Sequence, residues 1–333
     1  MRVTRRHFVA GATALPLCAI GQARAAEYNF RLPHDLPATH PLHVRAAEAS
    51  VRIREKTSGR VDITLFADSQ LGSDVKTIDM VRAGTVELFS CPGIILASAI
   101  PAASLNGVGF AFSSYPRIWA AMDGALGNYI RGEISKYGVI PVGRIANNGF
   151  RQNTSSTKPI RVPEDYKGMK LRVPASPLSL SLFRTLGAEP SAINLNEVYA
   201  ALKSHAVDAQ ETPLALVEAG KFYEVQTFCS LTNHMWDGYW MLANETIWRG
   251  LPGPVRDTIE QELDRAAMEE RADLAKRDPG MRGDMAEAGL EINSIDTALF
   301  RQALQRAGFY KEWRGKFGEK AWAVLEEAAG GLT

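Results

Sequence analysis

Residues 167–190 read KGMKLRVPASPLSLSLFRTLGAEP, the pattern of a short strand followed by a helix. Apolar and basic side chains alternate over 169–173, as in a strand with one buried face, and Pro174 ends the alternation. The helix is expected to end at Gly187. Arg172 stands at the carboxyl end of the strand, where ligands bind in α/β sheets. It is therefore a solvated charge at the sheet edge, the partner of an acid such as Glu211, or a site for an anion.

The chain on both sides continues this alternation of strand and helix. Downstream, NLNEVYAALKSH (194–205) predicts a helix and AVDAQETP (206–213) the strand after it. Upstream, residues 28–92 contain three strand patterns separated by two amphipathic helices. This order predicts a mostly parallel sheet and an α/β fold.

Two segments of the chain share one pattern, which suggests two similar lobes. RAGTVELFSCP (82–92) and KSHAVDAQETP (203–213) align without a gap, each with a basic helix end, a turn residue, a valine, an acid and a final proline. The alternative is that helix–turn–strand units resemble one another in general. Residues 255–277 lack Gly and Pro and predict a helix of ~33 Å, long enough to lie across both lobes.

The N-terminal segment and the composition indicate an exported protein. Arg5 and Arg6 precede an apolar stretch (8–20) and the small-residue motif ARA, so residues 1–25 are predicted to be a twin-arginine-type signal peptide. The apolar stretch is too short to span a bilayer permanently. The formal net charge is +1 among 333 residues, which gives no overall field to attract nucleic acid or an anionic membrane. A periplasmic location is expected if the source is a Gram-negative bacterium.

Sequence motifs for catalysis and for metal binding are scarce. GxSxG, HExxH and P-loop patterns are absent, and no activated nucleophile can be nominated. His34, His40 and His43 cluster in HDLPATHPLH. We expect His34 in the loop after the first strand and His40 beside a helix start, rather than a metal site. Cys91 and Cys229 are expected to be two buried thiols. We therefore predict no catalytic residue, no metal and no cofactor.

Several segments together resemble the DctP-type solute receptors of TRAP (tripartite ATP-independent periplasmic) transporters. They are DYKGMKLRVPAS, LGAEPSAINLNEVYAALKSHAVDAQETPL, SGRVDITLFADSQLGSD, GFRQNTSSTKPI and LTNH, in the family's order over about residues 28–252. The resemblance implies a bilobal periplasmic-binding-protein fold with a hinge. It also implies a receptor that closes on a small organic acid and delivers it to a membrane permease. Arg172 would form the main salt bridge to the substrate carboxylate, supported by Arg151.

We also predict which parts of the chain form the lobes, and the match between 82–92 and 203–213 places the cleft edges at the strand exits Ser90–Cys91 and Glu211–Thr212. Lobe I would comprise residues 26–149 and about 237–277, and lobe II residues 150–236 and about 278–333. The candidate ligand-binding residues are Arg172, Arg151, Thr212, Trp236, Glu211, Asn148, Phe110, Ser90, Cys91 and His34. Thr212 stands where the family usually has asparagine, which places the contact to the far half of the substrate in doubt.

The sequence leaves open which class of organic acid is bound and which function the binding serves. Trp236 and Phe110, if they face the cleft, suggest an apolar or ring-bearing monocarboxylate, and a sugar acid fits nearly as well because aromatic faces stack on sugar rings. The alternatives to transport are a periplasmic enzyme acting on an organic acid and a receptor that serves a signalling partner. The expected partners are the ligand and the permease subunits, without nucleic acid, and the protein is expected to be a monomer that is not embedded in the membrane.

Overall fold

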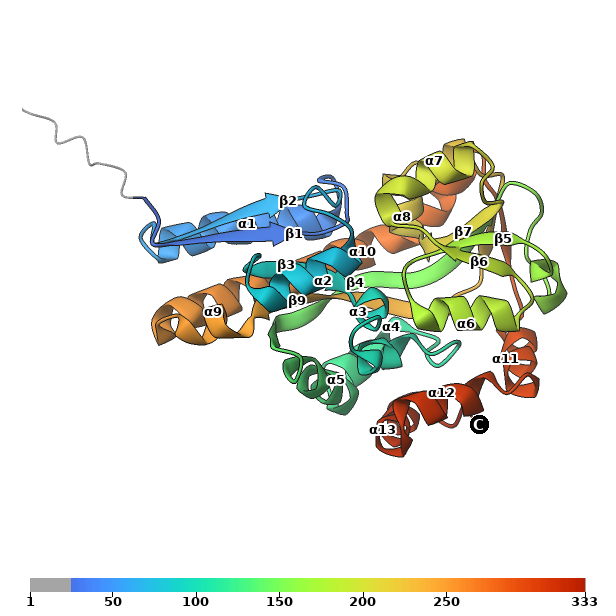
Figure 1. Ribbon diagram of the computed structural model, residues 1–333. Helices are drawn as coiled ribbons and strands as arrows, with labels where there is room; N and C mark the ends of the chain where they lie inside the picture. Colours follow the sequence, from blue (N-terminus) through green and yellow to red (C-terminus); the bar gives the residue numbers. More distant parts are fainter. Residues whose placement is uncertain (1–24, 333) are drawn as a thin grey trace, which may run out of the picture.

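The computed structural model describes residues 25–332, which form an α/β structure around one large sheet (Figure 1). The predicted signal peptide lies almost wholly outside the described residues. Within 25–332, no helix is both long enough and apolar enough to cross a membrane. The strands are β1 (Tyr28–Pro33), β2 (Val61–Phe66), β3 (Leu88–Pro92), β4 (Val139–Ser155), β5 (Lys170–Val173), β6 (Glu189–Ala192), β7 (Ala209–Pro213), β8 (Phe228–Leu231), β9 (Trp236–Asn244) and β10 (Glu291–Ser294).

Strand β4 connects the two halves of the structure. Its first half pairs antiparallel with β9, which pairs with β3, and β1 and β2 form a parallel pair of their own. Its second half pairs with β7 and β8, in the order β10-β8-β4-β7-β5-β6. We call β1–β3, β9 and the first half of β4 the first lobe, and β5–β8, β10 and the second half of β4 the second lobe. The pairing of β4 with β9 is irregular between Val142 and Ala146 and again between Asn147 and Gly149, where the strand passes between the lobes.

Helices cover the sheet and connect its strands. They are α1 (Pro41–Lys56), α2 (Asp74–Ala83), α3 (Gly93–Leu96), α4 (Tyr115–Met122), α5 (Ala125–Ser135), α6 (Pro177–Thr185), α7 (Val198–Lys203), α8 (Leu214–Ala219), α9 (Glu245–Gly250), α10 (Gly253–Glu287), α11 (Thr297–Arg306), α12 (Phe309–Phe317) and α13 (Glu319–Ala329). The 3₁₀ segments are η1 (Pro101–Gly107), η2 (Pro163–Tyr166), η3 (Leu195–Glu197) and η4 (Phe222–Glu224). The last two helices, α12 and α13, lie against η1, and α13 also contacts α4 and α5.

Helix α10 is longer than the sequence pattern predicts. It has 35 residues and continues through Pro279 and Gly280, whereas the predicted helix ended before them. It packs along α1 and β4 and then reaches α8 and β10 of the second lobe (Figure 1). The predicted long helix therefore contacts both lobes.

The two segments that share a sequence pattern also share a conformation. Gly84 after α2 and His205 after α7 both adopt the left-handed backbone conformation, with φ of 74° and 57°. The strands that follow end at Pro92 and Pro213, and each proline is the N-cap of the next helix. Because His205 occupies a conformation that glycine adopts without strain, the pattern reflects equivalent turns in the two lobes.

Candidate functional site

Arg172 is buried at the carboxyl end of β5 and has no acidic partner. Its side chain is 2% exposed, and its Nε donates a hydrogen bond to the Ile193 carbonyl at 2.9 Å. Among residues 25–332 its two terminal nitrogens make no hydrogen bond and no ion pair. Burial, followed by the positive charge of Arg151, lowers the pKa of Arg172 to about 10. A buried guanidinium in this state is poised to bind an anion.

Arg151, on β4, is paired within the protein. Its Nε donates to Glu211 Oε2, its Nη2 donates to the Glu211 carbonyl at 2.9 Å, and its Nη1 lies 4.0 Å from Asp237 Oδ2. His234 Nε2 lies 3.1 Å from the same Glu211 oxygen. Burial disfavours the charged form of both Arg151 and Glu211, but their mutual attraction outweighs it. The pKa of Glu211 is therefore below its usual range and the pKa of Arg151 is above it. Glu211 Oε1 remains buried without a hydrogen-bond partner in the described chain.

A group of acidic residues that the sequence analysis did not single out lies near Arg172. Asp35 follows β1 and accepts a hydrogen bond from the Tyr239 hydroxyl at 2.9 Å, whereas Asp74 begins α2 and its Oδ2 has no partner in the described part of the chain. Burial raises the pKa of Asp35 to about 6 and that of Asp74 well above its usual range, and the charge of Arg172 opposes both shifts. Both residues come after strands of the first lobe, so the rule that selected Arg172 could have found them.

The strand exits that were predicted to form the cleft edges are partly in this group. Thr212, at the end of β7, is 1% exposed, and its hydroxyl lacks a hydrogen-bond partner among residues 25–332. Burial and then the charges of Asp74 and Asp35 raise the pKa of the Cys91 thiol, so Cys91 lies close to them. Ser90 precedes Cys91 on β3 and lines a different cavity, together with Leu42 of α1, because neighbouring residues of a strand point to opposite faces.

The aromatic candidates lie in the hydrophobic core. The Trp236 indole packs edge-on against Trp119, with ring centroids 5.3 Å apart, and donates a hydrogen bond to Asn147 Oδ1 at 3.0 Å. The Phe110 ring lies 6.1 Å from that of Phe300 on α11. Their described contacts are with core residues, and the expectation that they face the ligand receives no support from these contacts.

The two remaining candidates, His34 and Asn148, each have one partner. His34 Nε2 lies 2.9 Å from His43 Nδ1, and burial lowers the pKa of His34 to about 4, so His34 is neutral at pH 7. Asn148 Nδ2 donates to Asp237 Oδ2 at 3.3 Å. Within residues 25–332, no cluster of three or more His, Cys, Asp or Glu side chains could hold a metal ion.

The two lobes meet beside this group of residues. A cavity of about 140 Å³ is lined by Asp35 and the loop after β2 on one side, and by η3, α7 and α8 on the other. Across the same boundary, Asn194 Nδ2 donates a hydrogen bond to Ser69 Oγ at 3.0 Å. Asp35 and Asp74 of one lobe therefore lie close enough to Arg172 of the other for their charges to interact, and we call this the closed arrangement.

Comparison with known proteins identifies the family of this fold and site. The profile of the DctP family, described as bacterial extracellular solute-binding protein, family 7, matches residues 32–314. The 2,3-diketo-L-gulonate-binding periplasmic protein YiaO of Escherichia coli is 30% identical over 303 residues, which cover 91% of this chain and 90% of that protein.

Solved structures of similar proteins have the same fold. A TRAP periplasmic solute-binding protein of Roseobacter denitrificans with bound L-galactonate is 27% identical, with a TM-score of 0.84 over 91% of this chain and 99% of the other. One of Sulfurospirillum deleyianum with bound succinate is also 27% identical, with a TM-score of 0.84 over 91% and 98%. The predicted bilobal α/β fold and the predicted family are thereby confirmed. The chain belongs to the DctP family, family 7 of the bacterial extracellular solute-binding proteins.

Proposed function

We propose that the protein binds one sugar acid, a polyhydroxylated monocarboxylate, between its lobes and delivers it to a TRAP-type membrane permease. The observation that carries the proposal is Arg172, a buried guanidinium whose terminal nitrogens have no partner in residues 25–332. Its planar fork matches a carboxylate with two parallel hydrogen bonds of ~1.5–3 kcal/mol each. Two such bonds with some apolar contact reach the ~8 kcal/mol of micromolar binding.

The residues around Arg172 favour a sugar acid over an aromatic acid. Asp35, Asp74, Thr212 and Tyr239 present carboxyl and hydroxyl groups, which can bind the hydroxyls of a sugar acid. Trp236 and Phe110, on which the aromatic alternative depended, pack in the core. The Escherichia coli and Roseobacter proteins support this choice, because 2,3-diketo-L-gulonate and L-galactonate are sugar acids.

The remaining steps of transport are part of the same proposal. The signal peptide is removed after Ala25, and the mature protein acts in the periplasm as a monomer without catalytic activity. Lobe I comprises residues 26–149 and about 237–277, and lobe II residues 150–236 and about 278–333, with the hinge in the chain that crosses between them. The ligand closes the lobes because it contacts both only in the closed form. The permease then recognises the closed form.

Calorimetric titration of residues 26–333 tests the proposal. The panel contains galactonate, glucuronate and 2,3-diketogulonate as sugar acids, succinate as a dicarboxylate and benzoate as an aromatic acid. We expect micromolar or tighter binding of at least one sugar acid, and weaker binding of succinate and benzoate. Nuclear magnetic resonance spectra of the bound acid after incubation should show it unchanged, as a receptor requires. Binding of benzoate alone, or conversion of an acid to product, would refute the proposal.

A further inference from the structure

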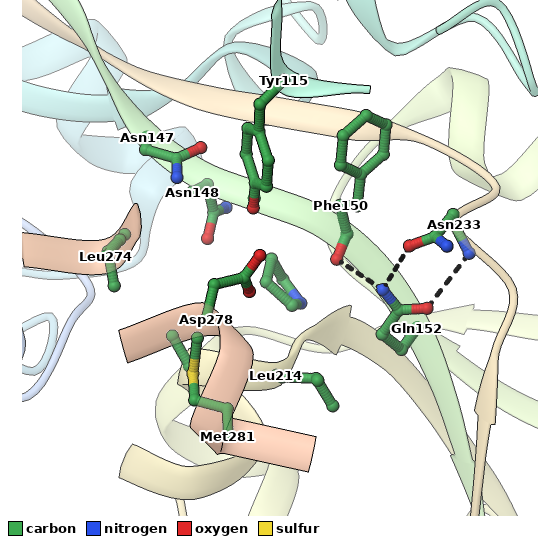
Figure 2. Close-up of a pocket in the computed structure, with 13 residues that line it drawn as sticks. Tyr115, Asn147, Asn148, Phe150, Gln152, Leu214, Asn233, Leu274, Asp278 and Met281 are labelled. Carbon is green, nitrogen blue, oxygen red and sulfur yellow. Dashed lines mark hydrogen bonds between the residues drawn. The ribbon is translucent and has the colours of Figure 1, made fainter. Parts of the chain in front are cut away.

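A second cavity lies where β4 passes between the lobes (Figure 2), and its lining does not include Arg172. We call it the hinge cavity. It encloses about 70 Å³, and its walls come from Tyr115 of α4, residues 147–150 and Gln152 of β4, the junction of β7 with α8, and Asp278 of α10. It is therefore formed by elements of both lobes, at the segment that must bend when the lobes open.

Two polar groups of the hinge cavity have no partner among residues 25–332. Asn148 is 2% exposed, and its Oδ1 makes no hydrogen bond, although its Nδ2 binds Asp237. Asp278 is half-buried and forms neither an ion pair nor a hydrogen bond in the described chain. Figure 2 shows its carboxylate directed towards the Tyr115 hydroxyl and the Asn148 side chain. The charge of Asp278 also contributes to the raised pKa of Tyr115, after burial, which places the two groups close together.

The residue types that line the hinge cavity indicate which kind of ligand it can bind. Asp278 is the only charged residue among the described residues that line the cavity, and the other polar groups that line it are amides, the Tyr115 hydroxyl and the main chain. Oxygen ligands without imidazole or thiolate suit hard cations rather than transition metals. One carboxylate balances one positive charge, whereas dedicated calcium sites use several carboxylates. The space is also sufficient for an ion with bound water.

We propose that the hinge cavity binds a monovalent alkali-metal cation, held by the Asp278 carboxylate, Asn148 Oδ1 and the Tyr115 hydroxyl, with water completing its coordination. The cation links α4, β4 and α10 across the hinge and favours the closed arrangement. Asn148 joins this site to the ligand site, because its amide donates to Asp237, which lies 4.0 Å from Arg151. Cation and ligand therefore raise each other's affinity by the same factor.

Thermal unfolding of the mature protein without ligand tests the cation site independently of the proposed function. Melting temperatures are compared in sodium, potassium and choline chloride at equal ionic strength. We expect a rise of about 2 °C in sodium or potassium relative to choline at concentrations well above the dissociation constant. The rise should be lost in Asp278→Asn. It should persist in Asp284→Asn, which removes the same charge from an exposed position of α10.

Crystals soaked in a thallous salt locate the ion directly. A thallium peak in anomalous difference maps between Asp278, Asn148 and Tyr115 would support the site, and its absence there at a concentration that stabilises the protein would overturn it. Equal responses of the wild type and Asp278→Asn to sodium would also overturn it, as would equal melting temperatures in the three salts.

Discussion

Replacement of Arg172 separates ligand binding from folding. Arg172→Lys keeps a positive charge but loses the planar fork and the hydrogen bond from Nε to the Ile193 carbonyl. One charge-assisted hydrogen bond to the ligand is lost, ~1.5–3 kcal/mol, so the ligand should bind about 10- to 150-fold more weakly. Arg172→Met removes both bonds, ~3–6 kcal/mol, and should weaken binding by roughly 10²- to 10⁴-fold.

Arg172→Met should weaken ligand binding without lowering the stability of the ligand-free protein. Burial lowers the pKa of Arg172 from 12.5 to about 10, which corresponds to about 3 kcal/mol against the charged form. Arg172→Met replaces this charge by an apolar side chain of similar length. The ligand-free variant should therefore melt at the same temperature as the wild type or at a higher one.

The assay is calorimetric titration of both variants with the tightest-binding sugar acid, together with thermal unfolding without ligand. Arg184→Lys is the matched control, because Arg184 is an exposed arginine on the helix that follows β5. It should bind like the wild type. Wild-type affinity of Arg172→Met would refute the role of Arg172 as the carboxylate anchor. A large loss of stability in the same variant would show that the arginine has an internal partner.

Three further predictions concern the lobe contact, a buried acid and the thiols. Asn194→Ala removes the hydrogen bond to Ser69 across the lobes and should weaken ligand binding by about 2- to 10-fold in calorimetry, with an unchanged melting temperature. Burial raises the pKa of Glu270 from 4.5 to about 8, so the folded state retains a proton that the unfolded chain releases, and stability falls as pH rises between these values. Glu270→Gln should therefore raise the melting temperature more at pH 8 than at pH 5, and equal gains would contradict the shift. Cys91 and Cys229 are free and buried, with thiol pKa values raised by burial. Neither should react with Ellman's reagent until the protein unfolds.

Local patterns in the sequence were sufficient to predict the elements around Arg172. The alternation over 169–173 and the proline after it correspond to β5, and the equivalence of 82–92 with 203–213 corresponds to equal turns and strand ends in the two lobes. These features depend on residues that are close in the chain. Backbone conformation is encoded at that range, whereas Arg172 is buried together with Leu171 and Val173 and so departs from the alternation that the pattern predicts.

Features that depend on distant residues could not be predicted in the same way. Residues 150–155 belong to the 17-residue strand β4, and their partners β7 and β8 come more than 50 residues later in the chain. Arg151 can be buried there because Glu211, 60 residues away, neutralises it. The orientation of Trp236 is likewise fixed by Trp119, which packs against it from α4. In both cases the partner that determines the burial is remote in sequence, and no local pattern encodes that contact.

The unpaired charge of Arg172 gives a physical reason for closure that depends on ligand. In the closed arrangement its burial disfavours the charged form by about 3 kcal/mol, a factor of ~10² in an equilibrium constant. An empty protein can relieve this cost by opening, which returns water to the guanidinium. Under the proposed function, a bound carboxylate would relieve it without opening, and the ligand would then stabilise the closed form by differential interaction rather than by affinity alone. Arg151, already paired with Glu211, gives no such bias, so we expect Arg172 rather than Arg151 to couple ligand binding to closure.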